Sequence, residues 1–210
     1  MTAPWSTSLL VIALCYLVGC FNSGYYLVRW HHGGDIREQG SGSTGATNVG
    51  RSLGAFGFVC TFILDMAKGV LAVWLAIRFQ LGPWALLLSV LAVLAGHIWP
   101  VQLRFHGGKG IATFLGALLA ADYFILLVSI TLFIAVFAFL RRFTLSGLAA
   151  LALTAPILAW WDRPAGRAFG YFILVVPVLY AHRQNLREDL TFIRGGTTEN
   201  PSAGPPSQEE

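Results

Sequence analysis

Charged side chains are scarce in this sequence of 210 residues. Asp, Glu, Lys and Arg together make up 11% of the chain, whereas a soluble domain usually carries about 25%. Hydrophobic residues make up 56%, and the mean hydropathy is +0.66. This composition excludes an ordinary soluble domain and predicts an all-α integral membrane protein. The net charge of +4 is small, and loop arginines account for it, so no nucleic-acid partner is expected.

Cysteine is also rare, and the spacing of the few cysteines does not indicate a disulfide framework. Cys15, Cys20 and Cys60 fall in apolar segments without paired spacing, which predicts neither disulfides nor a metal site. Residues 17–20 resemble a lipoprotein signal box. The residues before them, Met1 to Ser8, contain no Lys or Arg, so the basic region of a signal peptide is missing and an uncleaved first span is expected.

Several catalytic signatures are absent as well. The loops contain no carboxylate pair at general acid/base spacing, and no His/Cys/Glu set has zinc spacing. Residues 40–42 lack the spacing of a Gly-x-Ser-x-Gly nucleophile, and residues 107–110 do not form a Walker loop. None of the five histidines is followed by Asp in a His-x4-Asp pattern. The acyltransferase mechanism that depends on that pattern is therefore excluded.

Long apolar segments dominate what is present. Spans are predicted at about 7–28, 53–79, 82–99, 145–161 and 168–180, and a further apolar run covers 111–140. A single helix over that run would be about 45 Å long, against a hydrocarbon core of about 30 Å. It is either one long tilted helix or two elements that break near Ala121-Asp122, where its only charged residue lies.

Loop charge favours the broken run. With two elements the chain crosses seven times, and ten Lys/Arg gather on one side against three on the other, as the positive-inside rule requires. The ten are Arg29, Arg37, Arg51, Arg104, Lys109, Arg141, Arg142, Arg183, Arg187 and Arg194; the three are Arg78, Arg163 and Arg167. We therefore predict seven transmembrane helices, with the N-terminus outside and the C-terminus cytoplasmic. The piece at 111–121 would be a short element of about 16 Å.

One membrane-embedded domain is expected over residues 1–199, followed by a disordered tail at 200–210 that is rich in Pro, Ser and Glu. Within the second span, Asp65 and Lys68 lie three residues apart and share a helix face. Charges inside a span are costly and rarely face lipid. They form a structural ion pair between packed helices, a wall of a polar site, or both.

A glycine-rich polar run, Asp35 to Arg51, separates the first two spans. It cannot be exposed to the hydrocarbon core of the membrane, because its backbone groups would lack hydrogen-bond partners. It is either a surface linker or an anion site, since glycine lets backbone N–H groups crowd around a ligand and arginine suits phosphate.

Three polar clusters meet on the cytoplasmic face in this topology. They are residues 40–51, 96–110 and 182–185. Each has a plainer interpretation alone: a flexible turn at 107–110, an interface histidine at His97, and a helix cap at His182 and Asn185. Together they offer Arg51 and Lys109 as fixed cations, with glycine N–H donors and hydroxyls. Such a set suits a phosphate-bearing ligand.

These motifs resemble those of the bacterial acyl-phosphate:glycerol-3-phosphate acyltransferases, the PlsY family. Residues 40–51 follow its Gly-Ser-Gly-Asn-x-Gly-Ala-Thr-Asn-Val-x-Arg motif, with Ser43 in the Asn place. Residues 96–113 follow its Gly-His-x-x-Pro-Val and Gly-Gly-Lys-Gly string, and residues 182–185 follow His-Arg-x-Asn. Two lesser signatures match at 65–69 and 142–145. The third motif is stretched at its end, so that Glu199 lies well beyond Gly195-Gly196.

The resemblance implies a seven-span, N-out enzyme of the bacterial cytoplasmic (inner) membrane. It would transfer a fatty acyl group from acyl phosphate to the 1-hydroxyl of glycerol 3-phosphate, giving lysophosphatidic acid and phosphate. Its substrates would be glycerol 3-phosphate and acyl phosphate, in contact with membrane lipid, without a cofactor, a metal or an obligatory protein partner. The alternative is a transporter for a phosphorylated solute, and a lipid-binding scaffold is a further rival.

The resemblance also implies roles for individual residues. Arg51 and Lys109 would hold phosphate, and Ser41 would donate a hydrogen bond or position the substrate. His182 and Asn185 would orient the glycerol hydroxyl or polarise the acyl carbonyl. These five are the expected catalytic residues. The expected substrate-binding residues are Gly40, Gly42, Ser43, Thr47, Asn48, His97, Gly107, Gly108, Gly110 and Thr144.

Overall fold

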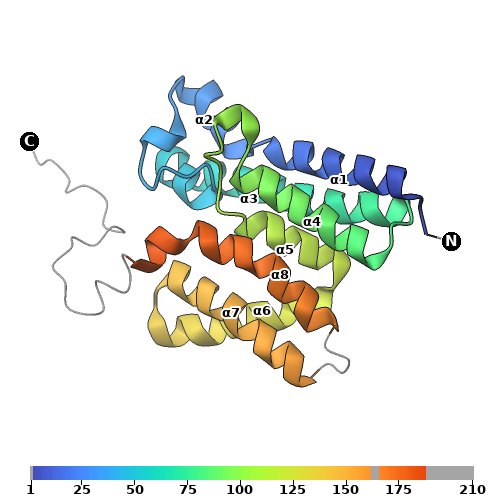
Figure 1. Ribbon diagram of the computed structural model, residues 1–210. Helices are drawn as coiled ribbons and strands as arrows, with labels where there is room; N and C mark the ends of the chain where they lie inside the picture. Colours follow the sequence, from blue (N-terminus) through green and yellow to red (C-terminus); the bar gives the residue numbers. More distant parts are fainter. Residues whose placement is uncertain (1, 162–165, 188–210) are drawn as a thin grey trace, which may run out of the picture.

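The computed structural model describes residues 2–161 and 166–187, and over these residues the chain is all-helical. The long helices are α1 (Trp5–Cys20), α2 (Ser23–His32), α3 (Ala46–Arg78), α4 (Pro83–Ile98), α5 (Ile111–Ala121), α6 (Tyr123–Leu140), α7 (Phe143–Trp161) and α8 (Gly166–Ala181). Short 3₁₀ turns lie at Ile36–Glu38 and Val101–Leu103. In Figure 1, α1, α3 and α4 form one group and α6, α7 and α8 another, with α5 between them.

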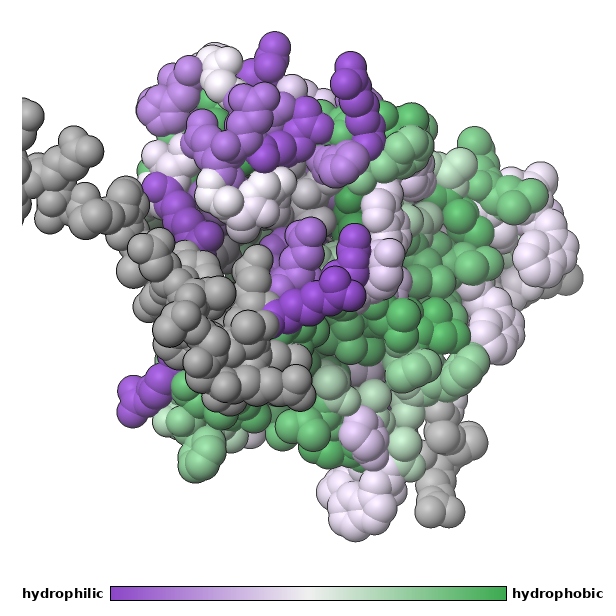
Figure 2. All heavy atoms as spheres, turned by 60° about the vertical axis from the view of Figure 1, so that its left-hand side comes forward, coloured by the Kyte–Doolittle hydropathy of each residue, from purple (hydrophilic) through white to green (hydrophobic). Residues whose placement is uncertain are grey.

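Five of these segments are long and apolar enough to cross a membrane: 5–32, 46–78, 83–103, 123–140 and 143–161. Helices α5 and α8 are shorter apolar helices. Figure 2 shows hydrophilic side chains at the top of the visible face, with a smaller group near its centre, and hydrophobic ones covering much of the rest. The protein is thus a multi-pass membrane protein, and each predicted apolar span is helical, although the first is broken and the second begins earlier than predicted.

The expected break in the 111–140 run is confirmed. Helix α5 ends at Ala121 and α6 begins at Tyr123. The Asp122 side chain accepts a hydrogen bond from the backbone N–H of Ile125 (3.2 Å) and therefore caps α6. It also pairs with Arg167 on α8 at 3.2 Å, so the corner between α5 and α6 is tied to the last helix.

The first span is not the single continuous helix expected over 7–28. It breaks at Phe21-Asn22, between α1 and α2. The freed carbonyls are satisfied internally: Lys68 Nζ donates to Phe21 O at 2.9 Å, and Asn22 Nδ2 donates to Cys20 O at 3.1 Å. Gln102 also donates to Cys20 O. Irregular backbone is tolerated at membrane depth where protein groups satisfy it in this way.

Helix α3 begins earlier than the predicted span, at Ala46, and contains a kink. Gly54 has φ +68° and ψ −163°, a conformation that is essentially restricted to glycine. The kink separates the first helical turns, which carry Thr47, Asn48 and Arg51, from the membrane-spanning part. These three residues can therefore belong to the polar end of the molecule.

Close glycine contacts bring the helices together. A Cβ on Gly19 or Gly96 would overlap backbone atoms of the other helix in the α1–α4 pair, and the same holds for Gly69 and Gly116 in the α3–α5 pair. Small residues at such crossings allow close packing where lipid supplies no hydrophobic drive between helices. The α3–α5 crossing fixes how the two helix N-termini that border the site lie relative to each other.

Candidate active site

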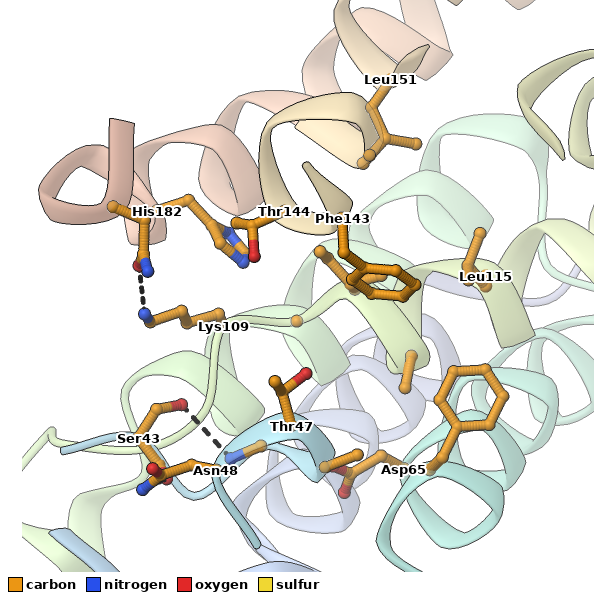
Figure 3. Close-up of a pocket in the computed structure, with 18 of the residues that line it drawn as sticks. Ser43, Thr47, Asn48, Asp65, Lys109, Leu115, Phe143, Thr144, Leu151 and His182 are labelled. Atoms are coloured by element: carbon orange, nitrogen blue, oxygen red, sulfur yellow. Dashed lines mark hydrogen bonds between the residues drawn. The ribbon is translucent and has the colours of Figure 1, made fainter. Parts of the chain in front are cut away.

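One pocket collects the predicted residues (Figure 3). Every predicted site residue with a side chain lines it: Ser41, Ser43, Thr47, Asn48, Arg51, His97, Lys109, Thr144, His182 and Asn185. Of the predicted glycines, Gly110 lines the pocket, whereas Gly40, Gly42, Gly107 and Gly108 are not among its lining residues. Residues about 140 positions apart in the sequence thus meet at one site.

Two contacts hold the first two polar loops together. Arg37 donates to Leu103 O at 2.7 Å and forms an ion pair with Asp35 at 2.6 Å. The backbone N–H of Thr44 donates to Gly107 O at 3.4 Å. The Thr44 hydroxyl in turn donates to Asn22 Oδ1 at 2.6 Å, which joins both loops to the break between α1 and α2. Thr44 was not among the predicted residues, although its place inside the motif could have suggested it.

Asn48 fastens the glycine-rich loop. Its side-chain amide donates to Ser43 O and Gln39 O, both at 2.9 Å, and its Oδ1 accepts from the backbone N–H of Ser41 at 3.0 Å. A Cβ at Gly40 would overlap Asn48, and Gly40 has φ +54°. Gly40 therefore permits the close approach by which Asn48 sets the path of the loop and the direction of Ser41.

Ser43 occupies a turn just before α3. Its Oγ accepts from the backbone N–H of Gly45 at 3.2 Å, and the residue is buried. A side-chain oxygen on a backbone N–H two residues later is a role that serine and asparagine share. The departure from the family motif at this position therefore leaves the local turn intact.

The N-termini of α3 and α5 both border the pocket. Gly45 and Ala46 line it on one side and Gly110 and Ile111 on the other, and neither helix has a side-chain hydrogen bond at its N-cap. The first N–H groups of a helix and its dipole attract anions. With Arg51 and Lys109 on the same wall, the pocket is suited electrostatically to phosphate.

His182 lies immediately after the C-terminus of α8 and is buried. Its Nδ1 is 2.8 Å from Val178 O. A carbonyl can only accept, so Nδ1 carries the proton and Nε2 of the neutral ring has a lone pair. Burial lowers the pKa of His182 to about 4, helped by the nearby Lys109 and opposed by the Val178 hydrogen bond. The imidazole is therefore neutral at pH 7 and can accept a proton.

Lys109 donates a hydrogen bond to Asn185 Oδ1, and Asn185 lies about one helical turn beyond His182 in the sequence. This contact joins the second and third polar clusters. Gly108 packs against the ring of His97, where a Cβ would overlap that ring. Because Lys109 follows Gly108 in the chain, this packing also fixes the position of the Lys109 backbone. Gly108 and His97 thus act on the pocket by placing the Lys109 backbone.

The intramembrane charges are paired, and one of them reaches the pocket. Lys68 Nζ lies 2.9 Å from Asp65 Oδ1, which also accepts from the Ser23 hydroxyl at 2.8 Å. His97 Nδ1 is 3.8 Å from the same oxygen. Asp65 and His97 line the pocket. Both interpretations of this pair therefore hold: it is a structural ion pair and part of the wall.

The other half of the pocket is apolar. It is lined by Phe58, Phe62, Ile111, Ala112, Leu115, Ile130, Phe133, Phe143, Gly147, Ala150 and Leu151, together with Ser129. The sequence did not single out these residues, because apolar residues that face a pocket look the same as those that face lipid. Among the described residues no cluster of His, Cys, Asp or Glu could hold a metal ion.

These features define a multi-pass membrane protein with a pocket that is cationic at one end and apolar at the other. The chain belongs to the glycerol-3-phosphate acyltransferase family, whose model matches residues 9–191. It is 46% identical to glycerol-3-phosphate acyltransferase 1 of Desulfitobacterium hafniense, over 87% of this chain and 90% of that protein. It is 36% identical to glycerol-3-phosphate acyltransferase 1 of Bacillus thuringiensis, over 85% of this chain and 98% of that one.

Two crystal structures have the same fold. Both are of PlsY, an integral membrane glycerol 3-phosphate acyltransferase. The glycerol 3-phosphate form has a TM-score of 0.79 and 31% identity, over 90% of this chain and 93% of that chain. The lysophosphatidic acid form has a TM-score of 0.76 and 30% identity over the same shares. The resemblance seen in the motifs is thereby confirmed.

Proposed function

We propose that this protein transfers a fatty acyl group from acyl phosphate to the 1-hydroxyl of glycerol 3-phosphate, giving lysophosphatidic acid and phosphate, as the first acylation of phospholipid synthesis. The observation that carries the proposal is the single pocket in which Arg51, Lys109 and His182 meet an apolar wall. Both substrates are anionic at the reacting end, and one has an apolar tail. Crystal structures of the related PlsY in glycerol 3-phosphate and lysophosphatidic acid forms support this choice.

The bond changes are simple. The glycerol hydroxyl oxygen attacks the acyl carbonyl carbon, the bond from that carbon to the phosphate oxygen breaks, and the electron pair leaves with phosphate. Arg51, Lys109 and the two helix N-termini stabilise the phosphates and the developing charge. Because acyl phosphate is an activated mixed anhydride, no covalent enzyme intermediate is needed.

The hydroxyl proton has two possible acceptors, Nε2 of His182 and a phosphate oxygen of the donor. Ser41 and Asn185 position the reacting groups in either case. A general base contributes typically 10²–10⁴-fold. A His182→Ala loss of that size assigns the proton transfer to His182; a loss below about tenfold would leave His182 with an orienting role only.

We assign the chain seven crossings, with α1 and α2 forming one discontinuous span. The N-terminus is outside and the pocket opens at the cytoplasmic face of the bacterial inner membrane. The excess of Lys/Arg around the polar loops supports this orientation. Residues 1–199 act as one domain; the tail at 200–210 and Glu199 lie outside the described residues.

A transporter for a phosphorylated solute uses the same cations, but it needs polar groups that continue to the far side. The pocket instead continues into apolar side chains between α3, α5, α6 and α7. This favours an enzyme that accommodates an acyl tail, in keeping with the family.

Donor choice tests the proposal. Purified protein is given labelled glycerol 3-phosphate with palmitoyl phosphate, palmitoyl-CoA or palmitoyl carrier protein in turn. We expect lysophosphatidic acid only from acyl phosphate, because the pocket provides cations for a compact phosphate leaving group. Equal product from palmitoyl-CoA would overturn the assignment of the donor.

A further inference from the structure

The ends of α4 and α8 meet at the turn that precedes α5. A Cβ at Gly110 would lie 3.3 Å from Ile98 Cδ1 and 3.5 Å from Val178 Cγ2. His97 directly precedes Ile98 in the chain. His182 lies one helical turn beyond Val178, whose carbonyl it contacts. Both histidines are buried and both line the pocket, so two imidazoles reach it from two helices beside the same turn.

The groups at its two nitrogens define how the His97 ring is oriented. Nε2 is the ring atom nearest to the position of a Cβ on Gly108. Nδ1 is 3.8 Å from Asp65 Oδ1 and has no hydrogen-bond partner among the residues that the structure describes. The ring therefore has Nδ1 on the side of Asp65 and Nε2 on the side of the turn that leads to Lys109.

Asp65 is itself held by other groups. Its Oδ1 accepts from the Ser23 hydroxyl at 2.8 Å and pairs with Lys68 Nζ at 2.9 Å. Lys68 also donates to Phe21 O at 2.9 Å, which ties the pair to the break between α1 and α2. The carboxylate is thus fixed in position and its charge is balanced by Lys68, so that a neutral imidazole fits beside it.

The polar end of the pocket is rich in hydrogen-bond donors. Arg51, Lys109 and the N-termini of α3 and α5 line it, and all of them donate. Asn185 Oδ1 can accept, but it already accepts from Lys109. Glycerol 3-phosphate has two hydroxyls besides its phosphate, and a buried hydroxyl without an acceptor is costly. A ring nitrogen with a lone pair is a suitable acceptor, and the pocket has two imidazoles.

We propose that Nε2 of His97 accepts a hydrogen bond from the 2-hydroxyl of glycerol 3-phosphate and that Asp65 is a positioning residue that fixes the required tautomer. The inference rests on the proposed function. A proton on Nδ1 points to Asp65 and leaves the lone pair on Nε2, as Val178 O does for the ring of His182. Hydrogen bonds at such sites are often long before the substrate binds. With His182 at the reacting 1-hydroxyl, each hydroxyl then has one imidazole.

The test compares glycerol 3-phosphate with 3-hydroxypropyl phosphate, which keeps the phosphate and the reacting hydroxyl but lacks the 2-hydroxyl. Palmitoyl phosphate is the donor, and the measurement is the ratio of the two kcat/KM values. In His97→Phe the ratio should fall at least about tenfold, because kcat/KM falls for glycerol 3-phosphate and changes little for the analogue. A residue that only packed against the turn would lower both values alike.

The role of Asp65 is tested by replacing the whole ion pair. Asp65→Leu/Lys68→Met leaves no buried charge without its partner, and its ratio should fall about three- to tenfold, because the ring can then adopt the other tautomer. Addition of His97→Phe should give the ratio of His97→Phe alone, since Asp65 acts through His97. Thr61→Val is the matched control and should keep the wild-type ratio, because Thr61 is buried one turn from Asp65 on the same face of α3 but does not line the pocket.

A wild-type protein that does not discriminate between the two substrates, or an active His97→Phe protein with an unchanged ratio, overturns the proposal. An unchanged ratio in Asp65→Leu/Lys68→Met refutes the role of Asp65. If these variants do not fold, or the analogue is not turned over, the ¹⁵N shifts of the His97 ring in wild-type protein decide. We expect the tautomer protonated at Nδ1, and protonation at Nε2 would refute the proposal. Failure of the proposed function is distinct, because wild-type protein would then form no lysophosphatidic acid from glycerol 3-phosphate.

Discussion

At the scale of single residues, the geometry of the site depends on the hydrogen-bond partners of a few polar atoms. The amide of Asn48 is used within the loop, and the nearby Ser41 lines the pocket. Nδ1 of His182 donates a hydrogen bond to Val178 O, so that Nε2 is the ring nitrogen left to act in the pocket. Buried polar groups of this kind fix geometry because each unsatisfied one is costly.

His182 should titrate far below an ordinary histidine. Its pKa is lowered to about 4 by burial, so the ring stays neutral as the pH falls through 6.5 and gains a proton only near pH 4. The measurement is an NMR titration of the imidazole in detergent micelles. A His182 midpoint near 6.5 would contradict the buried, carbonyl-bonded ring.

The polar residues could be predicted from the sequence because their types and spacing are unusual for loops between spans. Arg51, Lys109 and His182 were identified in this way and Ser41 through the resemblance to the family motifs, and all four line one pocket. The apolar wall could not be predicted, since Phe133 or Leu151 in an apolar helix carries no local sign of facing a pocket. Thr44 lies inside the motif, but its contact with Asn22 became visible only in the fold.

At the scale of helices, the site depends on discontinuities. The break at Asp122 was predictable because a lone carboxylate interrupts an apolar run. The break at Phe21-Asn22 and the kink at Gly54 were not, because Asn22 and Gly54 are each tolerated within a regular span. At the first break, Lys68 and Gln102 satisfy the freed carbonyls, and the kink lies at a residue whose positive φ favours glycine.

Lys68→Met should destabilise the protein strongly. It leaves Asp65 buried without its cation and removes the donor to Phe21 O. Breaking one side of a buried pair costs about 3–5 kcal/mol. The measurement is the free energy of unfolding in mixed micelles with increasing denaturant. The double variant Asp65→Asn/Lys68→Met should recover part of the loss, and a Lys68→Met protein as stable as wild type would refute the role given to the pair.

At the scale of the whole molecule, the polar loops gather at one end and the apolar helices form the remainder (Figure 1, Figure 2). The loops at 35–51 and 101–110 contact each other through Arg37 and Leu103. An enzyme arranged in this way can take a water-soluble phosphate from one side and a tailed phosphate from the membrane.

The orientation can be tested by cysteine labelling. A Cys60→Ala background leaves only the buried Cys15 and Cys20, and Thr2→Cys or His106→Cys then adds one exposed thiol. The N-terminus and the 101–110 segment lie at opposite ends of α4 and its neighbours (Figure 1). We expect a membrane-impermeant maleimide to label Thr2→Cys in spheroplasts and His106→Cys only after lysis, because the excess of Lys/Arg in the polar loops favours a cytoplasmic location for that end. The reverse pattern would invert the topology and place the pocket outside.

The most direct test of the proposed reaction is product stoichiometry in lipid vesicles, using purified protein, labelled glycerol 3-phosphate and palmitoyl phosphate. We predict one phosphate released for each lysophosphatidic acid formed. Lys109→Met should lower kcat/KM by about 10²–10³, as loss of one charge-stabilising donor does. Arg104→Met should retain activity, because Arg104 is an exposed cation of the same loop that does not line the pocket. Folded wild-type protein that forms no lysophosphatidic acid, or that releases phosphate without it, would contradict the account.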